Sequence, residues 1–222
     1  MTGSRQGKSD PSAEDHLVPG WLALVVLLLL VAVVGVGGFV VRGLVSNPRE
    51  MTPAQADVVS WSAKVRSDPA NLDSLLQLGY AYQRDGQADR AITEYALVLA
   101  KDPKNTAALY NTGILQIETG KAKAGEKTLW AVLKIEPKHA LAAKALGEYY
   151  ASKKQYKSLL VVVGPVAAAN PDLADLQYLL GVAYENLGQT SKAIVSYKNA
   201  LQFAPDLKPA RDALRRLQGG TK

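Results

Sequence analysis

Residues 72–105 read LDSLLQLGYAYQRDGQADRAITEYALVLAKDPKN, and the fold of this chain can be inferred from them. Gly79 and Pro103 of this stretch each return three more times along the chain, always after a step of 34 residues without insertion or deletion. A strict period of this length indicates an internal repeat in which each unit is one supersecondary element. The repeated positions are Gly79, Gly113, Gly147 and Gly181, followed by Pro103, Pro137, Pro171 and Pro205.

Within that stretch the apolar residues have helical spacing in two separate runs. Leu75, Leu78 and Tyr82 fall on one face of a first helix, and Gly86 marks the turn that follows. Residues 91–99 have the same spacing in a second helix, which ends before the proline because proline cannot continue a helix. One such hairpin cannot bury its own apolar face, so we expect the units to stack on one another as a solenoid.

This pattern resembles the tetratricopeptide repeat family. That family places a large residue, Leu-Gly, Tyr, Gly, Ala, an aromatic residue, Ala and Pro at fixed offsets. The first unit has Leu75, Leu78-Gly79, Tyr82, Gly86, Ala91, Tyr95, Val98 and Pro103 at these offsets, and the fourth has Gln177, Leu180-Gly181, Tyr184, Gly188, Ala193, Tyr197, Ala200 and Pro205. The resemblance implies an all-α, right-handed solenoid of helical hairpins. Its four units would span 72–105, 106–139, 140–173 and 174–207.

The third unit, 140–173, departs most from the family pattern. Lys154 and Leu159 stand where the family has glycine and alanine, and a Gly-Pro pair at 164–165 falls inside the expected second helix. Proline removes a backbone donor and clashes with the preceding turn, so we expect this helix to kink or break there. Short strands over 159–163 are the alternative, but the 34-residue period continues on both sides and favours a helix.

Helices outside the repeats are expected at both ends. Thr52 followed by Pro53 fits an N-cap and a first helical residue, so we expect a capping helix over 53–68 after a linker, 43–52. Residues 208–222 form a final amphipathic helix and tail. The apolar side of that helix would cover the last repeat, and its polar side would keep the end of the solenoid soluble.

An uninterrupted apolar run precedes the repeats. Residues 21–41, WLALVVLLLLVAVVGVGGFVV, contain no charged or polar side chain, and as a helix they would span about 30 Å, the thickness of the hydrocarbon core of a bilayer. Trp21 and Arg42 at its ends suit the two interfaces. We therefore expect a transmembrane helix over 19–42 after a disordered polar tail, 1–18. A buried soluble helix and a cleaved signal peptide are the alternatives, but the run is long for a signal peptide and no small-residue cleavage site follows it.

Charge leaves the orientation of this span open. Each flank has two basic residues, so the positive-inside rule gives a tie. Arg42 lies closest to the apolar run, which favours a cytoplasmic repeat domain. The short polar tail with its basic start is typical of a signal-anchor, which favours an extracytoplasmic repeat domain, and this is the side that we prefer.

The chain offers little material for catalysis. Its 222 residues include no cysteine and two histidines, which excludes disulfides and thiolate chemistry and leaves little for a zinc site or a catalytic triad. His16 lies in the polar tail and His139 in the turn before the third unit. No serine has the sequence context of a nucleophile. We therefore expect no catalysis, no cofactor and no metal ion, and an enzyme with an unrecognised site is the alternative.

The formal net charge of +6 is concentrated in two places. Residues 104–158 carry ten lysines and four glutamates, and residues 208–222 add further positive charge. A solvated lysine surface explains this distribution most simply, and an acidic partner or a lipid surface is the alternative. No arginine-rich patch with interleaved aromatic residues appears, so we expect no nucleic-acid partner.

The family resemblance implies a binding groove on the concave surface that the first helices of successive units line. Such a groove would take an extended peptide or a helix of a partner protein. Relatives that clamp a C-terminal carboxylate use Lys and Asn on the first helix of their first unit, and here those positions are Leu76 and Tyr80, so no such clamp is expected. The alternative is that the groove positions merely pack within or between repeats. These positions are Leu76, Tyr80, Gln83, Tyr110, Asn111, Ile114, Lys144, Glu148, Tyr178, Val182 and Glu185.

These features predict a membrane-anchored adaptor, scaffold or assembly factor that holds a partner protein at the bilayer. Residues 58–103 look similar to the repeat domains of bacterial cytochrome c maturation factors, which gives a narrower alternative. A third interpretation is a structural scaffold of a cell-envelope complex that assembles as a homo-oligomer through contacts between repeats.

Overall fold

The structure of the chain, a computed structural model, describes Val25 and residues 51–219. Residues 51–222 form a compact unit of their own. No helix among the described residues is both long and apolar enough to cross a bilayer. The predicted polar tail (1–18) and transmembrane helix (19–42) lie outside the described residues except for Val25, which is helical, and so does most of the predicted linker (43–52).

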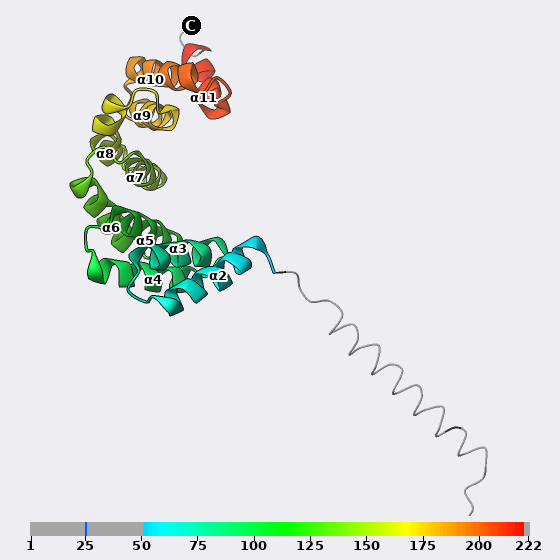
Figure 1. The fold of residues 1–222 in the computed structure, drawn as a ribbon. Helices are drawn as coiled ribbons and strands as arrows, with labels where there is room; N and C mark the ends of the chain where they lie inside the picture. Colours follow the sequence, from blue (N-terminus) through cyan, green and yellow to red (C-terminus); the bar gives the residue numbers. More distant parts are fainter. Residues whose placement is uncertain (1–24, 26–50, 220–222) are drawn as a thin grey trace, which may run out of the picture. The chain divides into compact units, whose positions relative to one another are not determined.

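Ten α-helices joined by short turns make up residues 51–219, and no strand occurs in this part of the chain. The prediction of an all-α chain is therefore confirmed for the described residues. The helices are α2 Pro53–Ser67, α3 Leu72–Arg84, α4 Ala88–Lys101, α5 Thr106–Glu118, α6 Ala122–Ile135, α7 Ala140–Ser152, α8 Tyr156–Ala169, α9 Ala174–Asn186, α10 Thr190–Phe203 and α11 Lys208–Gly219 (Figure 1).

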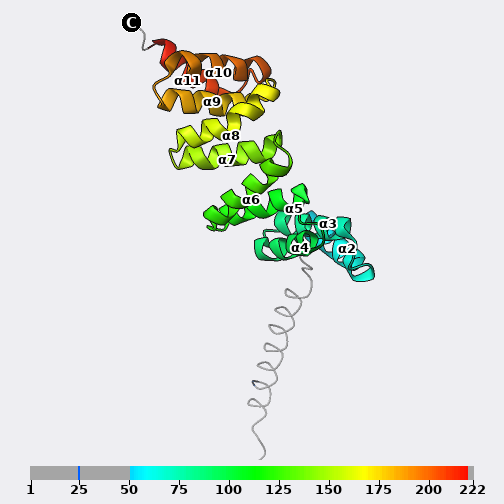
Figure 2. The same ribbon diagram turned by 90° about the vertical axis from the view of Figure 1, so that its left-hand side faces the viewer.

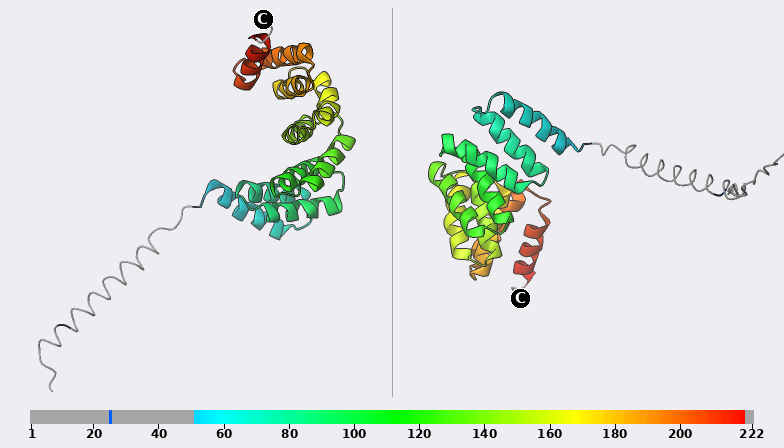
Figure 3. Two further views of the ribbon diagram at one scale, coloured as in Figure 1. Left: turned by 180° about the vertical axis from the view of Figure 1, so that it is seen from behind. Right: turned by 90° about the horizontal axis from the view of Figure 1, so that it is seen from below.

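Within residues 51–219 each helix lies beside the next one in the chain, and the pairs form a curved row (Figure 1). The helices α3, α5, α7 and α9 lie on the inner side of the curve, and α4, α6, α8 and α10 lie on the outer side. Figure 2 shows the α7–α8 and α9–α10 pairs stacked one above the other, and Figure 3 shows the row from behind and from below. The repeat period therefore gives this part of the chain two long faces with different helices on each.

The core extends along the row instead of gathering at one centre. Three clusters of buried side chains follow one another, around Tyr95, around Leu146 and around Tyr197, and all three of these residues are almost fully buried. Each cluster joins helices of neighbouring pairs, because no hairpin can bury its apolar face alone. This continuity keeps the inner helices in register with one another.

The second helix of the third unit does not break at its proline. The helix α8 continues from Tyr156 to Ala169 with Pro165 inside it, so of the predicted kink or break the break does not occur, and the alternative of strands over 159–163 is wrong. The physical reason lies in exposure. Proline leaves the carbonyl group of residue i−4 without a donor, and that residue is Val161, which is 66% exposed. Water can satisfy this carbonyl group, so the helix continues at a modest cost.

The two end helices are held by local contacts. The Thr52 hydroxyl accepts a hydrogen bond from the Gln55 amide at 3.2 Å, while the Gln55 side chain accepts one from the Thr52 amide at 3.2 Å. This reciprocal capping box satisfies backbone donors at the start of α2. At the other end, Ala210 and Ala213 of α11 are buried against α10. The last repeat thereby has its apolar side covered.

Candidate functional site

All the groove positions implied by the family resemblance lie on α3, α5, α7 and α9, the inner helices of the row. The side chains differ in how far they reach the surface. Tyr80 and Glu148 are exposed, and Asn111 is buried. The other positions, all partly buried, are Leu76, Gln83, Tyr110, Ile114, Lys144, Tyr178, Val182 and Glu185.

Two tyrosines from neighbouring units, Tyr80 on α3 and Tyr110 on α5, lie on the first two inner helices. Tyr80 is 36% exposed and meets the Tyr95 ring edge-on, with 6.1 Å between ring centres. The Tyr110 ring lies 5.5 Å from the His139 ring. Burial raises the pKa of Tyr110, and the Glu148 carboxylate and the Tyr80 phenol raise this pKa further. Tyr80 on α3 and Tyr110 on α5 thus each contact an aromatic ring of their own unit.

A small hollow opens between α5 and α7. It has a volume of about 280 Å³, and Ile114, Glu148 and Tyr149 are among the residues that line it. Ile114 and Glu148 were groove positions, whereas Tyr149 and its neighbour in the hollow, Ala145, were missed. Their spacing gave a signal that could have found them, because residues 145, 148, 149 and 152 share one helical face of α7.

Lys144 links two inner helices. Its ammonium group donates a hydrogen bond to the Asp175 carboxylate of α9 and lies 4.0 Å from a Glu148 carboxylate oxygen on its own helix. The hydrogen bond to Asp175 raises the pKa of Lys144, although partial burial acts in the opposite direction. The side chains are partly exposed, so the ion pairs position Lys144 more than they stabilise the domain.

At the C-terminal end of the inner face, hydrogen bonds join side chains of α9, α10 and α11. The Tyr197 hydroxyl donates a 2.7 Å hydrogen bond to Glu185, and Arg216 of α11 donates a 2.6 Å hydrogen bond to the other oxygen of the same carboxylate. The Tyr178 ring lies 5.9 Å from the Tyr197 ring, and a cavity of about 490 Å³ lies beside them between α9, α10 and α11. Glu185 is therefore engaged within the chain at this end.

Three of the groove positions are occupied by internal contacts. Asn111 is 3% exposed and its amide donates a 2.7 Å hydrogen bond to the Ala107 carbonyl group. The side chain of Gln83 accepts a 3.1 Å hydrogen bond from the Tyr95 hydroxyl, and Glu185 is bound as described above. Each of these three side chains is therefore hydrogen-bonded within the chain.

His139 is the N-cap residue of α7. It caps α7, where its Nδ1 accepts a 3.1 Å hydrogen bond from the Ala142 amide. Within residues 51–219 no group of three or more His, Cys, Asp or Glu side chains is placed to hold a metal ion.

Comparison with known proteins decides the family. Residues 82–149 match the tetratricopeptide repeat, and residues 174–207 match it separately. The chain is a tetratricopeptide repeat protein. A MamA fragment from Desulfovibrio magneticus RS-1 has a similar structure, with a TM-score of 0.60 and 26% sequence identity over 66% of this chain and 82% of that one. A MamA RS-1 double mutant gives a TM-score of 0.62 and 25% identity over 68% of this chain and 85% of that one.

Two curated proteins match part of the chain. The peroxisomal targeting signal receptor of Komagataella phaffii is 28% identical over 160 residues, which are 67% of this chain and 27% of the receptor. The N-terminal acetyltransferase A complex subunit-like protein of Schizosaccharomyces pombe is 26% identical over 108 residues, 49% of this chain and 16% of that protein. This chain thus matches only a minor part of the length of either relative. Repeats of this class present extended surfaces to other proteins, so the chain is a protein–protein interaction module.

Proposed function

We propose that the inner face of this tetratricopeptide domain binds an extended peptide or a helix of a partner protein. The observation that carries the proposal is a row of aromatic and apolar side chains that stays accessible along α3 and α5. Tyr80 is exposed, Tyr110 and Ile114 are partly exposed, and a hollow opens beside Ile114 toward α7. Aromatic residues of this kind commonly supply most of the affinity of an interface.

Charged groups of both signs border this row. Glu118 and Glu148 stand at the hollow, and Lys144 lies between Glu148 and Asp175. An apolar centre with a polar border is the usual composition of a binding surface. The partner segment would place apolar side chains against the tyrosines and polar groups against the border.

We further propose that residues 19–42 anchor the protein in a bilayer as a single transmembrane helix. The support is the uninterrupted apolar run at 21–41. The protein would then act as an adaptor, scaffold or assembly factor, with its repeats on the extracytoplasmic side. Anchoring keeps a partner near the membrane by raising its effective concentration there, without any bond being made or broken.

A pull-down after cross-linking of the intact protein tests the inner face. We expect the Tyr80→Ala, Tyr110→Ala double variant to lose the co-purified partner, because it removes two aromatic anchors. The helical circular dichroism signal should survive, since both side chains are at least partly exposed. The matched control is Leu97→Ala with Val161→Ala, which removes two exposed apolar side chains from α4 and α8 on the outer side. Equal capture by the inner-face variant and this control would show that the groove assignment is wrong.

Self-association is separated from partner binding by sedimentation. If the protein were a scaffold that assembles through repeat-to-repeat contacts, residues 51–222, which form their own compact unit, would sediment as an oligomer. A monomer at high concentration would contradict the scaffold and leave the binding of a different protein in place.

A further inference from the structure

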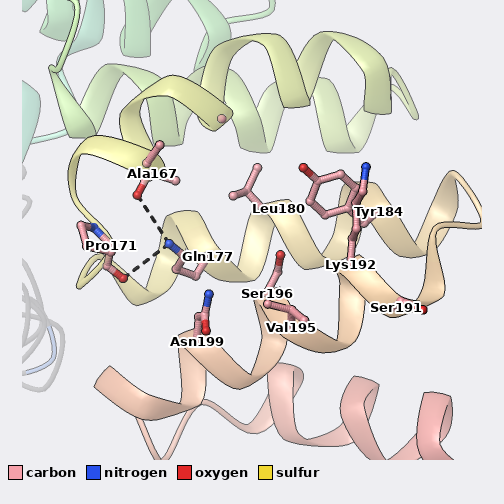
Figure 4. A pocket seen from close by; sticks show the side chains of 12 residues that line it. Ala167, Pro171, Gln177, Leu180, Tyr184, Ser191, Lys192, Val195, Ser196 and Asn199 are labelled. Atoms are coloured by element: carbon pink, nitrogen blue, oxygen red, sulfur yellow. Dashed lines mark hydrogen bonds between the residues drawn. The ribbon is translucent and has the colours of Figure 1, made fainter.

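A third hollow, called here the outer hollow, is lined by residues of α8, α9 and α10 (Figure 4). Its volume is about 520 Å³, which is within the range of pockets that bury a ligand. Apolar groups form much of its wall, including Gly164 and Ala167 of α8, Leu180 of α9 and Val195 of α10. None of the groove positions on the inner face lines this outer hollow.

At the outer hollow the third unit lacks a side chain that the second unit has. Gly164 stands 34 residues after Trp130, at the same position of the repeat. The Trp130 indole donates a 3.0 Å hydrogen bond to the Tyr150 hydroxyl. Tyr150 in turn stands 34 residues before Tyr184, which lines the outer hollow. In the second unit the chain therefore places its own tryptophan against the tyrosine of the next unit.

In the third unit that place is open. A Cβ atom added at Gly164 would meet no atom within 4 Å outside its own helical backbone. Tyr184 therefore has no neighbouring ring from position 164, in contrast to Tyr150. The repeat itself indicates what fits here, because an indole fills the equivalent place one unit earlier.

The charge in the lining of the outer hollow is positive. Lys192 is the charged residue among the twelve that line it, and its ammonium group lies 5.4 Å from the centre of the Tyr184 ring. The lining includes no carboxylate. The buried amide of Gln177 is directed at the Ala167 and Pro171 carbonyl groups at 3.5 and 3.4 Å. A ligand with a negative charge next to its ring would complement this lysine.

We propose that the outer hollow docks an aromatic side chain of a partner protein, best a tryptophan, with an acidic residue beside it. The ring would lie over Gly164 and against Tyr184, and the carboxylate would face Lys192. This site is separate from the inner face. One repeat domain would then hold two segments at once, one on each side of the row.

Fluorescence anisotropy with the full-length chain in detergent tests this site. The probe is a short fluorescein-labelled peptide, capped at both ends, with the sequence Gly-Gly-Trp-Glu-Gly-Gly. We expect saturable binding by the unaltered chain and a loss of affinity of at least about tenfold in Gly164→Trp, which fills the hollow from within. The matched control is Ala96→Trp, the same change at the equivalent exposed position of the first unit, and it should keep the affinity. Peptides with alanine for the tryptophan or lysine for the glutamate should bind more weakly.

A charge exchange keeps the proposal testable if Gly164→Trp fails to fold. Lys192 is exposed, so Lys192→Glu should leave the fold intact. This substitution should weaken the binding of the glutamate peptide and strengthen the binding of the lysine peptide. Equal binding by the unaltered chain and Gly164→Trp, or no response to the charge exchange, would overturn the proposal. Loss of the peptide in Tyr80→Ala, Tyr110→Ala would also overturn it, because the probe would then occupy the inner face.

Discussion

The ring of Tyr197 packs directly on the backbone of Gly181, so closely that a Cβ on this glycine would lie 2.5 Å from the ring. The same contact joins Tyr95 to Gly79 in the first unit. The second helix of each of these units can approach its first helix only because the glycine has no side chain. In the second and third units Leu129 and Val163 occupy the equivalent place against Gly113 and Gly147, so the glycine is needed whichever large side chain faces it.

We predict that Gly181→Ala lowers the free energy of unfolding by about 1–3 kcal/mol, since the added methyl group forces the Tyr197 ring to move. Gly164→Ala is the matched control, because the same change inside α8 meets open space. It should instead raise the stability by up to about 1 kcal/mol through better helix propensity. Urea unfolding of both variants measures the difference. Equal effects of the two changes would contradict the packing argument.

Alkaline pH should destabilise the domain. Burial raises the pKa of Tyr197 and of Tyr95 above the usual value of 10.0, and the hydrogen bond to Glu185 raises the pKa of Tyr197 further. The folded chain therefore keeps these protons while the unfolded chain releases them. Their contribution is complete below about pH 10 and is lost as the pH rises from there toward the folded-state pKa.

Urea midpoints at neutral pH and at about pH 11 should show this loss of stability. Tyr197→Phe keeps the ring but removes the ionisable hydroxyl, so its stability should fall less between the two conditions. If Tyr197→Phe lost as much stability between the two pH values as the unaltered chain, Tyr197 would not contribute to the alkaline loss.

Pro165 inside α8 should lower the stability of the domain, and replacing this one residue should restore it. Pro165→Ala restores the hydrogen bond to the Val161 carbonyl group and removes the steric clash. We expect a gain of about 1–3 kcal/mol in the free energy of unfolding, because alanine removes the clash and is a better helix former than proline. Lys157→Ala, an exposed change on the same helix, should be nearly neutral. A loss of stability in Pro165→Ala would mean that the proline shapes the packing around it.

Thiol labelling tests the proposed anchor and its orientation. The chain has no cysteine, so Met51→Cys and Arg5→Cys each introduce a single thiol, one on either side of the apolar run. With the repeats on the extracytoplasmic side, an impermeant reagent should label the first variant on intact cells and the second only after lysis. The reverse pattern would place the repeats in the cytoplasm, and equal labelling of both variants would contradict a single span.

The family and the all-α class can be inferred from the amino-acid sequence alone. The 34-residue recurrence of Gly79 and Pro103 is visible without any structure, and helical spacing is a local property of the chain. The positions of the helices depend on short-range signals such as the turn at Gly86 and the cap at Thr52. Nearest-neighbour stacking then repeats the same contact from unit to unit.

Which side chains are accessible and which are hydrogen-bonded within the chain depends on how the helices pack in the folded domain. Arg216 reaches Glu185 across 31 residues of sequence, because α11 folds back beside α9 and α10. The Asn111 amide donates a hydrogen bond to a carbonyl group of its own helix, and α8 continues through Pro165, which lies on the exposed side of that helix. The outer hollow needs Gly164 on α8 and Tyr184 on α9 to be brought together. Such pairings depend on how closely stacked helices approach, and a period in the sequence repeats positions without revealing that geometry.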